Sequence, residues 1–405
     1  MGSFLELGIN PVFIEKLKQR SIAKPTAIQS LVIPRLLKGE STVFCSATGT
    51  GKTFAYLLPI LSQLFINEKE SEKKESSGLE FMIIAPTLEL CSQIKVEIDF
   101  LLDSVPIRSS LLIGSVNLDR QIEKLKKERP SIVIGNPGRL LILSKMGKLR
   151  FSSLRFLVLD EADRLTAREC IEETEQLLAN IERNVKQHEN LCLAACSATV
   201  SDKTRAQLGA LFQSAEIVIN EDHEILREKI EHWAIFTEKR RKDQTLRSLL
   251  SALKEKKSRM KALIFTSRSD EAALVLSRLQ HHHVSAAGLF GKAGKKQISN
   301  AERKAALDSF REGRIYALVS TDLAGRGLDI PGITHVIALD VPDDSEVYIH
   351  RCGRTGRAGK RGVMITLGDE TQMRLLASLE KKLKIKVQPK ELHYGKVCTP
   401  LPIDD

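Results

Sequence analysis

The sequence predicts two α/β domains, each with a mainly parallel sheet that carries helices on both faces. Short apolar runs recur along the chain, and each is only four or five residues long, too short for a buried helix. Stretches with a helical pattern separate these runs. Strands that are apolar on both faces and alternate with helices are typical of a parallel sheet covered on both sides. The chain has 405 residues, 42% of them hydrophobic, which is enough for two separate cores.

The expected strands fall into two series along the chain. The first series is at residues 42–45, 81–85, 132–135, 156–159, 191–195 and 216–220, and the second is at 262–266, 316–320, 335–339 and 363–367. The charged segment at 221–229 lacks apolar alternation and favours a linker. We therefore expect an N-terminal domain at 1–220, a linker at 221–228, a C-terminal domain at 229–375 and a short Lys-rich tail at 376–405.

The basic charge of the chain is uneven. The net charge is +11, with a pI of about 9.2. Residues 1–220 hold 28 Lys and Arg against 26 Asp and Glu, whereas residues 221–405 hold 34 against 25. A basic second half indicates either a polyanionic partner such as nucleic acid or a solvated, soluble surface.

Cysteine usage and hydropathy point to the cytoplasm. The seven cysteines form no CxxC pair, which favours reduced, buried thiols over a zinc site or a disulfide framework. No apolar run reaches the roughly 18–20 residues of a membrane span. The first residues have neither a basic leader region nor an Arg-rich presequence. We expect a cytoplasmic monomer that makes no membrane contact.

A glycine-rich segment lies between the first expected strand and an apolar helical stretch. It consists of Ser46, Ala47, Thr48, Gly49, Thr50, Gly51, Lys52 and Thr53. Glycines let backbone N–H groups turn toward phosphates, and the next helix presents its positive N-terminal end. Lys52 adds a charge for the β- and γ-phosphates, and Thr53 offers a hydroxyl to Mg²⁺. A merely structural turn does not need the Lys-Thr pair, so this segment predicts a nucleotide site.

An acidic pair, Asp160 and Glu161, follows the expected strand at 156–159. The carboxyl edge of a parallel sheet is where ligands bind. One carboxylate can hold Mg²⁺, and its neighbour can position or deprotonate a water molecule. Such a pair alone is also typical of a turn or a helix cap, but the phosphate loop upstream favours the catalytic interpretation.

Four arginines crowd a glycine-rich segment near the end of the second half. They are Arg351, Arg354, Arg357 and Arg361, next to His350. Burying them together without anions would be costly, so we expect them to face phosphate or carboxylate. A planar guanidinium suits the charge that spreads over a transferring phosphoryl group. A salt-bridged surface loop or plain RNA contact is the alternative.

Six motifs occur in a fixed order: SATGTGKT (46–53), PTLEL (86–90), DEAD (160–163), SAT (197–199), TDLAGRGLDI (321–330) and HRCGRTGR (350–357). With them the chain resembles the DEAD-box family of ATP-dependent RNA helicases, from about residue 4 to residue 367. The resemblance implies two tandem RecA-like domains, ATP and Mg²⁺ as cofactors, and RNA bound largely through its backbone.

The resemblance also implies roles for individual residues. For adenine these are Phe4, which would stack on the base, and Gln29 of the segment SIAKPTAIQ, which would hydrogen-bond to it. Around the phosphates they are Lys52, Thr53, Asp160 for the metal, Glu161 for the attacking water, Gly327 and Asp329, with Arg354 and Arg357 as arginine fingers. The RNA-backbone positions are Pro86, Thr87, Gly114, Pro137, Gly138, Arg139, Thr266 and Thr321, and those coupling the domains are Asp163, Ser197, Thr199 and His350.

Departures from the family pattern fall mainly on the RNA positions. They are Ser46 for Ala, Ser21 and Ile22 for Gly and an aromatic residue, Leu88 for Arg, Asn136 for Thr, Ser115 for Gly, and Asn300 for Gln. Because Leu88 replaces an arginine, one expected phosphate contact is missing. The ATP positions are therefore more complete than the RNA positions.

These observations predict an RNA-dependent ATPase that closes two domains on ATP and RNA. Such an enzyme separates short RNA duplexes or remodels RNA–protein complexes. The alternative is an ATP-gated RNA clamp or assembly platform with little unwinding; a DNA helicase and an unrelated ATPase are more distant alternatives. A protein partner that targets the enzyme to its RNA is a further expectation. The Lys-rich segment at 381–390 is either an RNA contact or a solvated edge.

Overall fold

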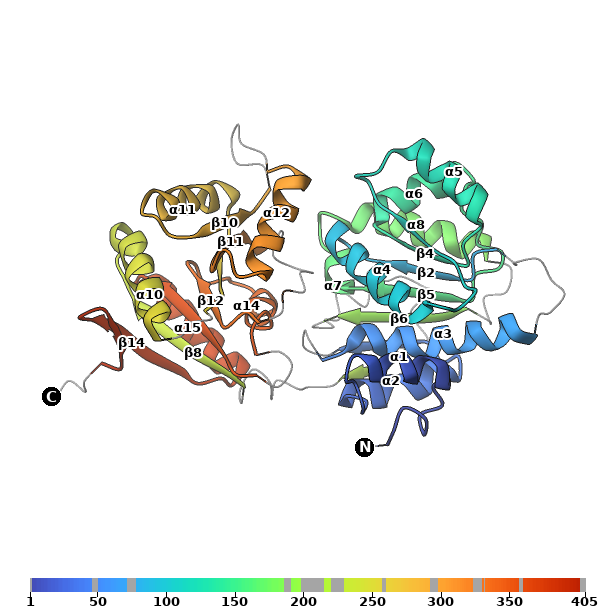
Figure 1. The fold of residues 1–405 in the computed structure, drawn as a ribbon, viewed down its shortest axis with the longest axis horizontal. Coiled ribbons are helices and arrows are strands. Elements are labelled where there is room, and N and C mark those ends of the chain that lie inside the picture. The colour runs from blue at the N-terminus through green and yellow to red at the C-terminus, as the bar shows by residue number, and fades with distance from the viewer. Residues whose placement is uncertain are drawn as a thin grey trace. The chain divides into compact units, whose positions relative to one another are not determined.

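The chain divides into two compact units, unit 1 at Met1–Glu221 and unit 2 at Asp222–Asp405. Figure 1 shows the fold of each unit in a computed structural model. The residues that the structure describes are 2–45, 50–70, 78–185, 191–197, 215–219, 229–256, 260–291, 298–322, 330, 332–356 and 360–400. The expected linker, residues 221–228, lies outside these ranges.

Unit 1 contains a seven-stranded parallel sheet. Its strands are β1 (Thr42–Cys45), β2 (Phe81–Ile84), β3 (Ser109–Leu112), β4 (Ile132–Gly135), β5 (Phe156–Asp160), β6 (Cys192–Ser197) and β7 (Glu216–Ile219). They are arranged in the order β3-β4-β2-β5-β6-β1-β7. Every residue of β2, β4, β5 and β6 is buried, which explains why the sequence shows these strands as continuous apolar runs.

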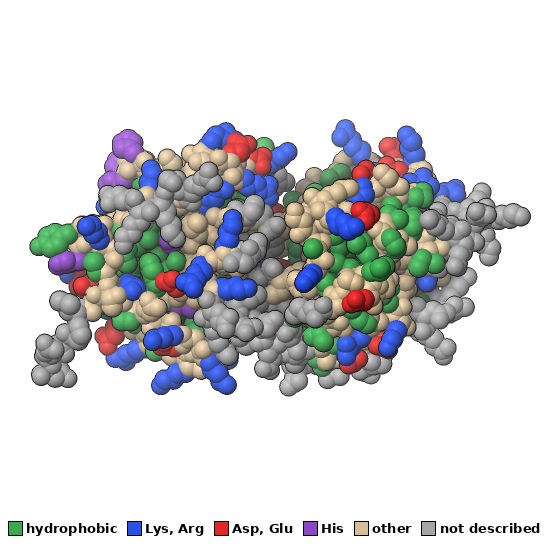
Figure 2. Space-filling model, turned by 60° about the horizontal axis from the view of Figure 1, so that its bottom comes forward, with side chains coloured by type: hydrophobic (Ala, Val, Ile, Leu, Met, Phe, Trp, Pro, Cys, Tyr) green, Lys and Arg blue, Asp and Glu red, His purple; other side chains and the backbone are tan. Residues whose placement is uncertain are grey.

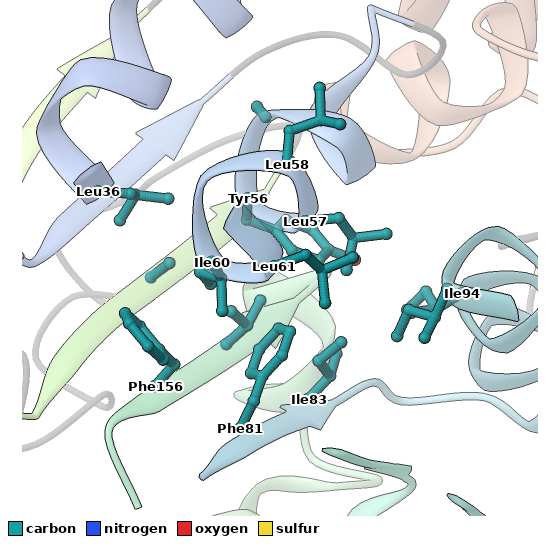
Figure 3. Close-up of a cluster of buried hydrophobic side chains, with 14 of the residues drawn as sticks. Leu36, Tyr56, Leu57, Leu58, Ile60, Leu61, Phe81, Ile83, Ile94 and Phe156 are labelled. Carbon is teal, nitrogen blue, oxygen red and sulfur yellow. The ribbon is translucent and has the colours of Figure 1, made fainter. Parts of the chain in front are cut away.

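Helices cover both faces of this sheet. They are α1 (Pro11–Gln19), α2 (Ala27–Leu37), α3 (Lys52–Glu70), α4 (Leu88–Leu102), α5 (Leu118–Glu128), α6 (Pro137–Lys145), α7 (Ala162–Leu165) and α8 (Ile171–Asn184). One core lies between the sheet and α1 to α4, and the other between the sheet and α5 to α8. Figure 3 shows the first core, where Ile60 and Leu61 of α3 lie near Phe81 and Ile83 of β2.

Unit 2 contains an eight-stranded sheet. Its strands are β8 (Ile230–Phe236), β9 (Ala262–Thr266), β10 (Ala286–Leu289), β11 (Ala317–Thr321), β12 (His335–Ala338), β13 (Gly362–Gly368), β14 (Val387–His393) and β15 (Lys396–Cys398). Their order is β10-β11-β9-β12-β13-β8-β14-β15, and among these pairs only β14 and β15 are antiparallel.

The helices of unit 2 also lie on both faces. They are α10 (Lys242–Lys256), α11 (Ser269–His281), α12 (Asn300–Arg311), α14 (Ser345–Cys352) and α15 (Glu370–Leu383), preceded by a short 3₁₀ turn at Lys239–Arg241. Apolar residues of α10 and α11 fill one core, and those of α12, α14 and α15 fill the other. The α/β class with two parallel sheets is therefore confirmed.

Several strands escaped the sequence prediction. β3 and β10 are edge strands with small or partly exposed residues, and β8 alternates between buried and exposed side chains. The boundary expected at residue 375 falls inside α15, and β14 pairs with β8 from Val387 to Lys390. Much of the segment expected to be a tail thus folds onto the sheet of unit 2.

Among the described residues, no helix is long and apolar enough to cross a membrane.

Candidate active site

The described part of the phosphate loop ends in a glycine that needs an unusual backbone conformation. Gly51 has a φ of +91°, and a Cβ at this position would overlap the side-chain nitrogen of Gln29. Only glycine meets both conditions without strain. Lys52 begins α3 directly after this turn, with Thr53 next to it. Ser46, Ala47, Thr48 and Gly49 lie outside the described residues.

Gln29 joins the loop to α2. Its Nε2 donates a hydrogen bond to the Gly51 carbonyl at 3.0 Å, and its Oε1 accepts one from the backbone N–H of Thr26 at 2.9 Å. The second bond is half of a capping box that starts α2. The amide retains one N–H and one lone pair. Adenine recognition by Gln29 stays a prediction.

Phe4 is only 2% exposed and belongs to the core that α1 to α4 form with the sheet. Its ring is therefore largely enclosed by unit 1. Stacking of Phe4 on adenine also stays a prediction.

Asp160 is the last residue of β5, and three donors surround its carboxylate. Oδ2 accepts from the Tyr56 hydroxyl at 2.8 Å, whereas Oδ1 accepts from the Cys196 thiol and from the Glu161 N–H, both at 2.9 Å. Burial raises the pKa of Asp160 above its ordinary value, and the Cys196 thiol and the charge of Lys52 oppose this rise. The carboxylate is held in one orientation, and its ionisation depends on these neighbours.

Tyr56 and Cys196 were not predicted from the sequence as residues of this site. Tyr56 lies four residues after Lys52 and so on the same face of α3, a spacing that could have pointed to it. Cys196 lies opposite Asp160 because β5 and β6 pair in parallel with these residues in register. That register cannot be read from the sequence. Ser197, the next residue, is 1% exposed at the end of β6, and Thr199 lies outside the described residues.

Glu161 has a strained backbone. Its φ is +52° and its ψ +54°, a left-handed conformation that costs a residue with a side chain about 1–3 kcal/mol. Its Oε2 is buried without a hydrogen-bond donor among the described residues, and Arg164 Nη1 is 3.8 Å away. Asp163 follows within the first turn of α7.

Several residues of unit 1 that were predicted to contact RNA also begin or cap its helices. Thr87 caps α4, because its Oγ1 accepts from the Leu90 N–H at 3.2 Å. Pro137 occupies the first turn of α6, and Gly138 follows it. Pro86 is partly exposed between β2 and α4.

Arg139 holds the loop that contains Gly114. Its guanidinium donates to the carbonyls of Gly114 and Val116, each at 3.0 Å, and to Gln121 Oε1 at 2.8 Å. A Cβ added to Gly114 would meet open space. These contacts place Arg139 as a support of the loop; its contact with RNA stays a prediction.

In unit 2, Thr266 and Thr321 lie side by side. They end the neighbouring parallel strands β9 and β11 and are paired in register. Thr266 Oγ1 donates to the Arg268 carbonyl at 3.1 Å. The structure therefore brings together two residues that are 55 positions apart in the sequence and were both predicted to contact RNA.

The arginine segment of unit 2 divides by environment. Arg351 is 1% exposed and donates to both carboxylate oxygens of Asp322, at 2.6 and 2.7 Å, and to Asp340 Oδ1 at 2.7 Å. Its expected pairing with carboxylates is thus observed. Arg354 is 4% exposed, and its Nε donates to the His350 carbonyl at 3.2 Å. Gly327, Asp329 and Arg357, which were also predicted as site residues, lie outside the described residues.

Two family models match this chain. "DEAD/DEAH box helicase" matches residues 26–208, and "Helicase conserved C-terminal domain" matches residues 241–359. The chain belongs to the DEAD-box helicase family. Among curated relatives, the "DEAD-box ATP-dependent RNA helicase CshC" of Bacillus cereus is 32% identical over 91% of this chain and 88% of that protein. The "ATP-dependent RNA helicase CshA" of Listeria monocytogenes is 33% identical over 96% of this chain and 70% of that protein.

Solved structures of DEAD-box helicases share the fold. "S. cerevisiae Dbp5 bound to RNA and ADP BeF3" has a TM-score of 0.82 and 25% identity, covering 96% of each chain. Mss116p bound to single-stranded RNA and AMP-PNP also has a TM-score of 0.82, with 26% identity over 95% of this chain and 78% of that chain. The two α/β units of this DEAD-box protein are accordingly tandem RecA-like domains, as the resemblance implied.

Proposed function

We propose that this DEAD-box protein is an RNA-dependent ATPase that remodels RNA. The observation that carries the proposal is the link between Tyr56 and Asp160. It ties the carboxyl end of β5 to the helix that begins at Lys52, directly after the phosphate loop. This link supports our assignment of the acidic pair and the described end of the loop to one site, as ATP hydrolysis requires.

The residues of unit 1 fit a nucleotide with Mg²⁺. Asp160 is a buried carboxylate whose raised pKa reports a charge that lacks sufficient compensation, and a divalent cation supplies such compensation. Asp160 and the Thr53 hydroxyl would hold the ion. When bound, Mg²⁺ neutralises charge on the phosphates. Lys52 would contact the β- and γ-phosphates, and the Glu161 carboxylate would orient the attacking water.

The two units would work together. We assign Arg354 and Arg357 as arginine fingers that reach the γ-phosphate when the units close on ATP. RNA would bind across the positions at Gly114, Pro137–Arg139, Thr266 and Thr321. Closure would complete both binding sites together, so ATP and RNA should bind with positive and reciprocal coupling. A strand bent in the closed state cannot remain in a regular duplex, so a few base pairs would separate.

The comparisons support RNA as the substrate. Two relatives are named ATP-dependent RNA helicases, and two structural neighbours were solved with RNA and an ATP analogue. Contacts mainly to the backbone would give little sequence selectivity. We further infer a cytoplasmic monomer that a protein partner could direct to its RNA.

The test replaces Glu161 by Gln. This variant should bind ATP like the wild type and lose RNA-stimulated turnover, because only the water-orienting carboxylate is removed. Phosphate release is measured with and without RNA, and binding with a fluorescent ATP analogue. Glu169→Gln, an exposed carboxylate outside the site, is the matched control. Wild-type turnover in Glu161→Gln would overturn the role assignment, and wild-type ATPase activity that ignores RNA would overturn the proposed function.

One observation favours the ATP-gated clamp as a second candidate. Leu88, where the family has Arg, packs against the core of unit 1 and offers no charge to RNA. A clamp should hold RNA in the presence of ATP yet release no strand from a short duplex, so strand displacement measured beside ATPase activity separates the two functions. Leu88→Arg should steepen the salt dependence of RNA binding by roughly 0.7 in log–log slope.

A further inference from the structure

The C-terminal end of unit 2 forms a β-hairpin with an unusual turn. β14 and β15 pair up to His393↔Lys396, which leaves a two-residue loop of Tyr394 and Gly395. Their φ values are +46° and +72°, as in a type I′ turn. Asn, Asp or Gly is preferred at the first of these positions. Tyrosine is therefore a poor choice for the turn itself.

Packing does not explain this tyrosine either. Tyr394 is 93% exposed, so its ring contributes little to the core. The ring of His393 lies against it, with centroids 4.4 Å apart and planes at 73°. An aromatic pair thus projects from the end of the hairpin into solvent. A strained, exposed aromatic residue suggests a ligand, because neither folding nor turn chemistry favours it.

The sequence that carries this pair is strongly basic. Residues 381–400 contain six lysines and one acidic residue, Glu391. Five of the lysines are exposed: Lys381, Lys382, Lys384, Lys386 and Lys396. None of these five pairs with a carboxylate of the residues that the structure describes. Figure 2 shows Lys and Arg side chains spread over the visible face of unit 2, several of them along its lower rim.

The sixth lysine has a structural role. Lys390 Nζ lies 5.5 Å from the centre of the Trp233 ring and donates to Thr399 Oγ1 at 2.8 Å. It anchors β14 on β8. Within the described part of the chain, the five exposed lysines have no comparable partner, which leaves them available to an anion.

The hairpin is remote from the expected RNA positions of unit 2. Three strands, β12, β13 and β8, separate β9 from β14 in the sheet. At about 4.8 Å per strand, this places β14 roughly 19 Å from the strand that ends in Thr266. Lys386 precedes β14 and Lys396 follows the turn, so basic groups flank a strand about 23 Å long.

We propose that this hairpin is a second RNA-binding surface, on which Tyr394 stacks on a base and the exposed lysines contact phosphates. Aromatic side chains within a basic surface are the combination that binds single-stranded nucleic acid without reading its sequence. A membrane surface would instead need an apolar helical face, which the hairpin lacks. The inference rests on the proposed function in one respect, because it takes RNA to be the polyanion that binds the hairpin. Its role would be to retain RNA while the two units are open.

The first test replaces Tyr394 by Asn in the full chain. The resulting Asn-Gly loop is the favoured type I′ turn, so the ring is lost while the hairpin is strengthened. Binding of a fluorescein-labelled single-stranded RNA of about 20 nucleotides, longer than a site of about 4–16, is followed by anisotropy without nucleotide. The dissociation constant should rise between about fivefold and a hundredfold, as for one lost base–aromatic stack. Tyr394→Phe should bind like the wild type.

The second test removes charge. In the triple variant Lys384→Gln, Lys386→Gln and Lys396→Gln, the log–log salt slope should fall by about 2, at about 0.7 for each lost phosphate contact. The control removes three exposed lysines of unit 1, Lys38, Lys145 and Lys148, and should leave the slope unchanged.

ATPase measurements separate failure of this inference from failure of the proposed function. At saturating RNA, the hairpin variants should reach the wild-type turnover rate but need more RNA to do so. If Tyr394→Asn and the lysine triple variant bind RNA like the wild type, the second surface does not exist, even where RNA stimulates the wild-type ATPase. If RNA neither binds to nor stimulates the wild type, both proposals are wrong.

Discussion

Replacing Arg351 by Gln should destabilise unit 2 severely. The guanidinium makes three hydrogen bonds to the carboxylates of Asp322 and Asp340 and a fourth to the Asp340 carbonyl at 2.8 Å. Its removal leaves two carboxylates facing each other without a cation. Breaking a buried ion pair by removing one partner costs about 3–5 kcal/mol. The carboxylate side chains are 22% and 15% exposed, so water can partly replace the arginine, and we expect about 3 kcal/mol.

The chain provides its own probe for this measurement. Trp233 is the only tryptophan and lies in β8, so its fluorescence reports the unfolding of unit 2. With a urea m-value of about 2 kcal/mol/M, a loss of about 3 kcal/mol moves the midpoint down by about 1.5 M. Arg374→Gln is the control, because Arg374 and its partner Glu370 are 79% and 75% exposed. That pair should contribute no more than about 0.5 kcal/mol.

The comparison of the two variants decides the outcome. Equal midpoints for Arg351→Gln and Arg374→Gln would refute the reasoning, since burial of the Arg351 network would then have no energetic consequence. Arg351→Lys should recover only part of the loss, because an ammonium cannot make the two-pronged contact with Asp322.

Three further predictions concern unit 1. Gly51→Ala should weaken binding of a fluorescent ATP analogue by about tenfold or more, because a left-handed φ alone costs a residue with a side chain about 1–2 kcal/mol. An unchanged affinity would show that the loop tolerates a Cβ at this position. Asp160→Asn should stabilise the nucleotide-free protein by about 1 kcal/mol at neutral pH in thermal melts followed by circular dichroism. The sign follows because the pKa of Asp160 is raised in the folded state. The contribution of Asp160 to folding stability is fully present below its unfolded pKa of about 3.9 and is lost as pH rises through its folded pKa. The stability gained by Asp160→Asn should therefore vanish near pH 3. Cys196→Ala should raise the Mg²⁺ concentration needed for binding of the analogue by about fivefold, which corresponds to one lost hydrogen bond, whereas Cys196→Ser should not raise it. Equal Mg²⁺ titrations of Cys196→Ala and the wild type would exclude a role for the thiol.

The nucleotide loop and the central strands could be predicted because local chemistry determines them. The Gly-Lys-Thr run depends on backbone freedom and charge at adjacent positions, and the strands at Phe81–Ile84 and Phe156–Asp160 are buried on both faces. Neither feature requires knowledge of distant residues. The same holds for the capping box at Thr26 and Gln29, whose residues are three apart.

Features that depend on strand register could not be predicted. Cys196 reaches Asp160 only because β6 lies beside β5 with these two residues aligned. Likewise, β14 is a strand because β8 offers it an edge, although its own sequence contains Pro389 and the adjacent charges Lys390 and Glu391. Pro389 is compatible with this place near the edge of the sheet and would argue against a central strand.

The structure also changes how the departures at the RNA positions should be judged. Arg139 holds the loop at Gly114 through main-chain carbonyls, and a side chain at Gly114 would meet open space. A loop supported through its backbone tolerates a change such as Ser115, because neither the support nor a contact made by a backbone N–H depends on the side chain there. Leu88 differs, since the family's contact at that position is a side-chain charge and this chain instead has a partly buried apolar group that packs against the core. Of these two departures we therefore expect only Leu88 to weaken RNA binding, and a basic hairpin elsewhere on unit 2 is one way to compensate for it.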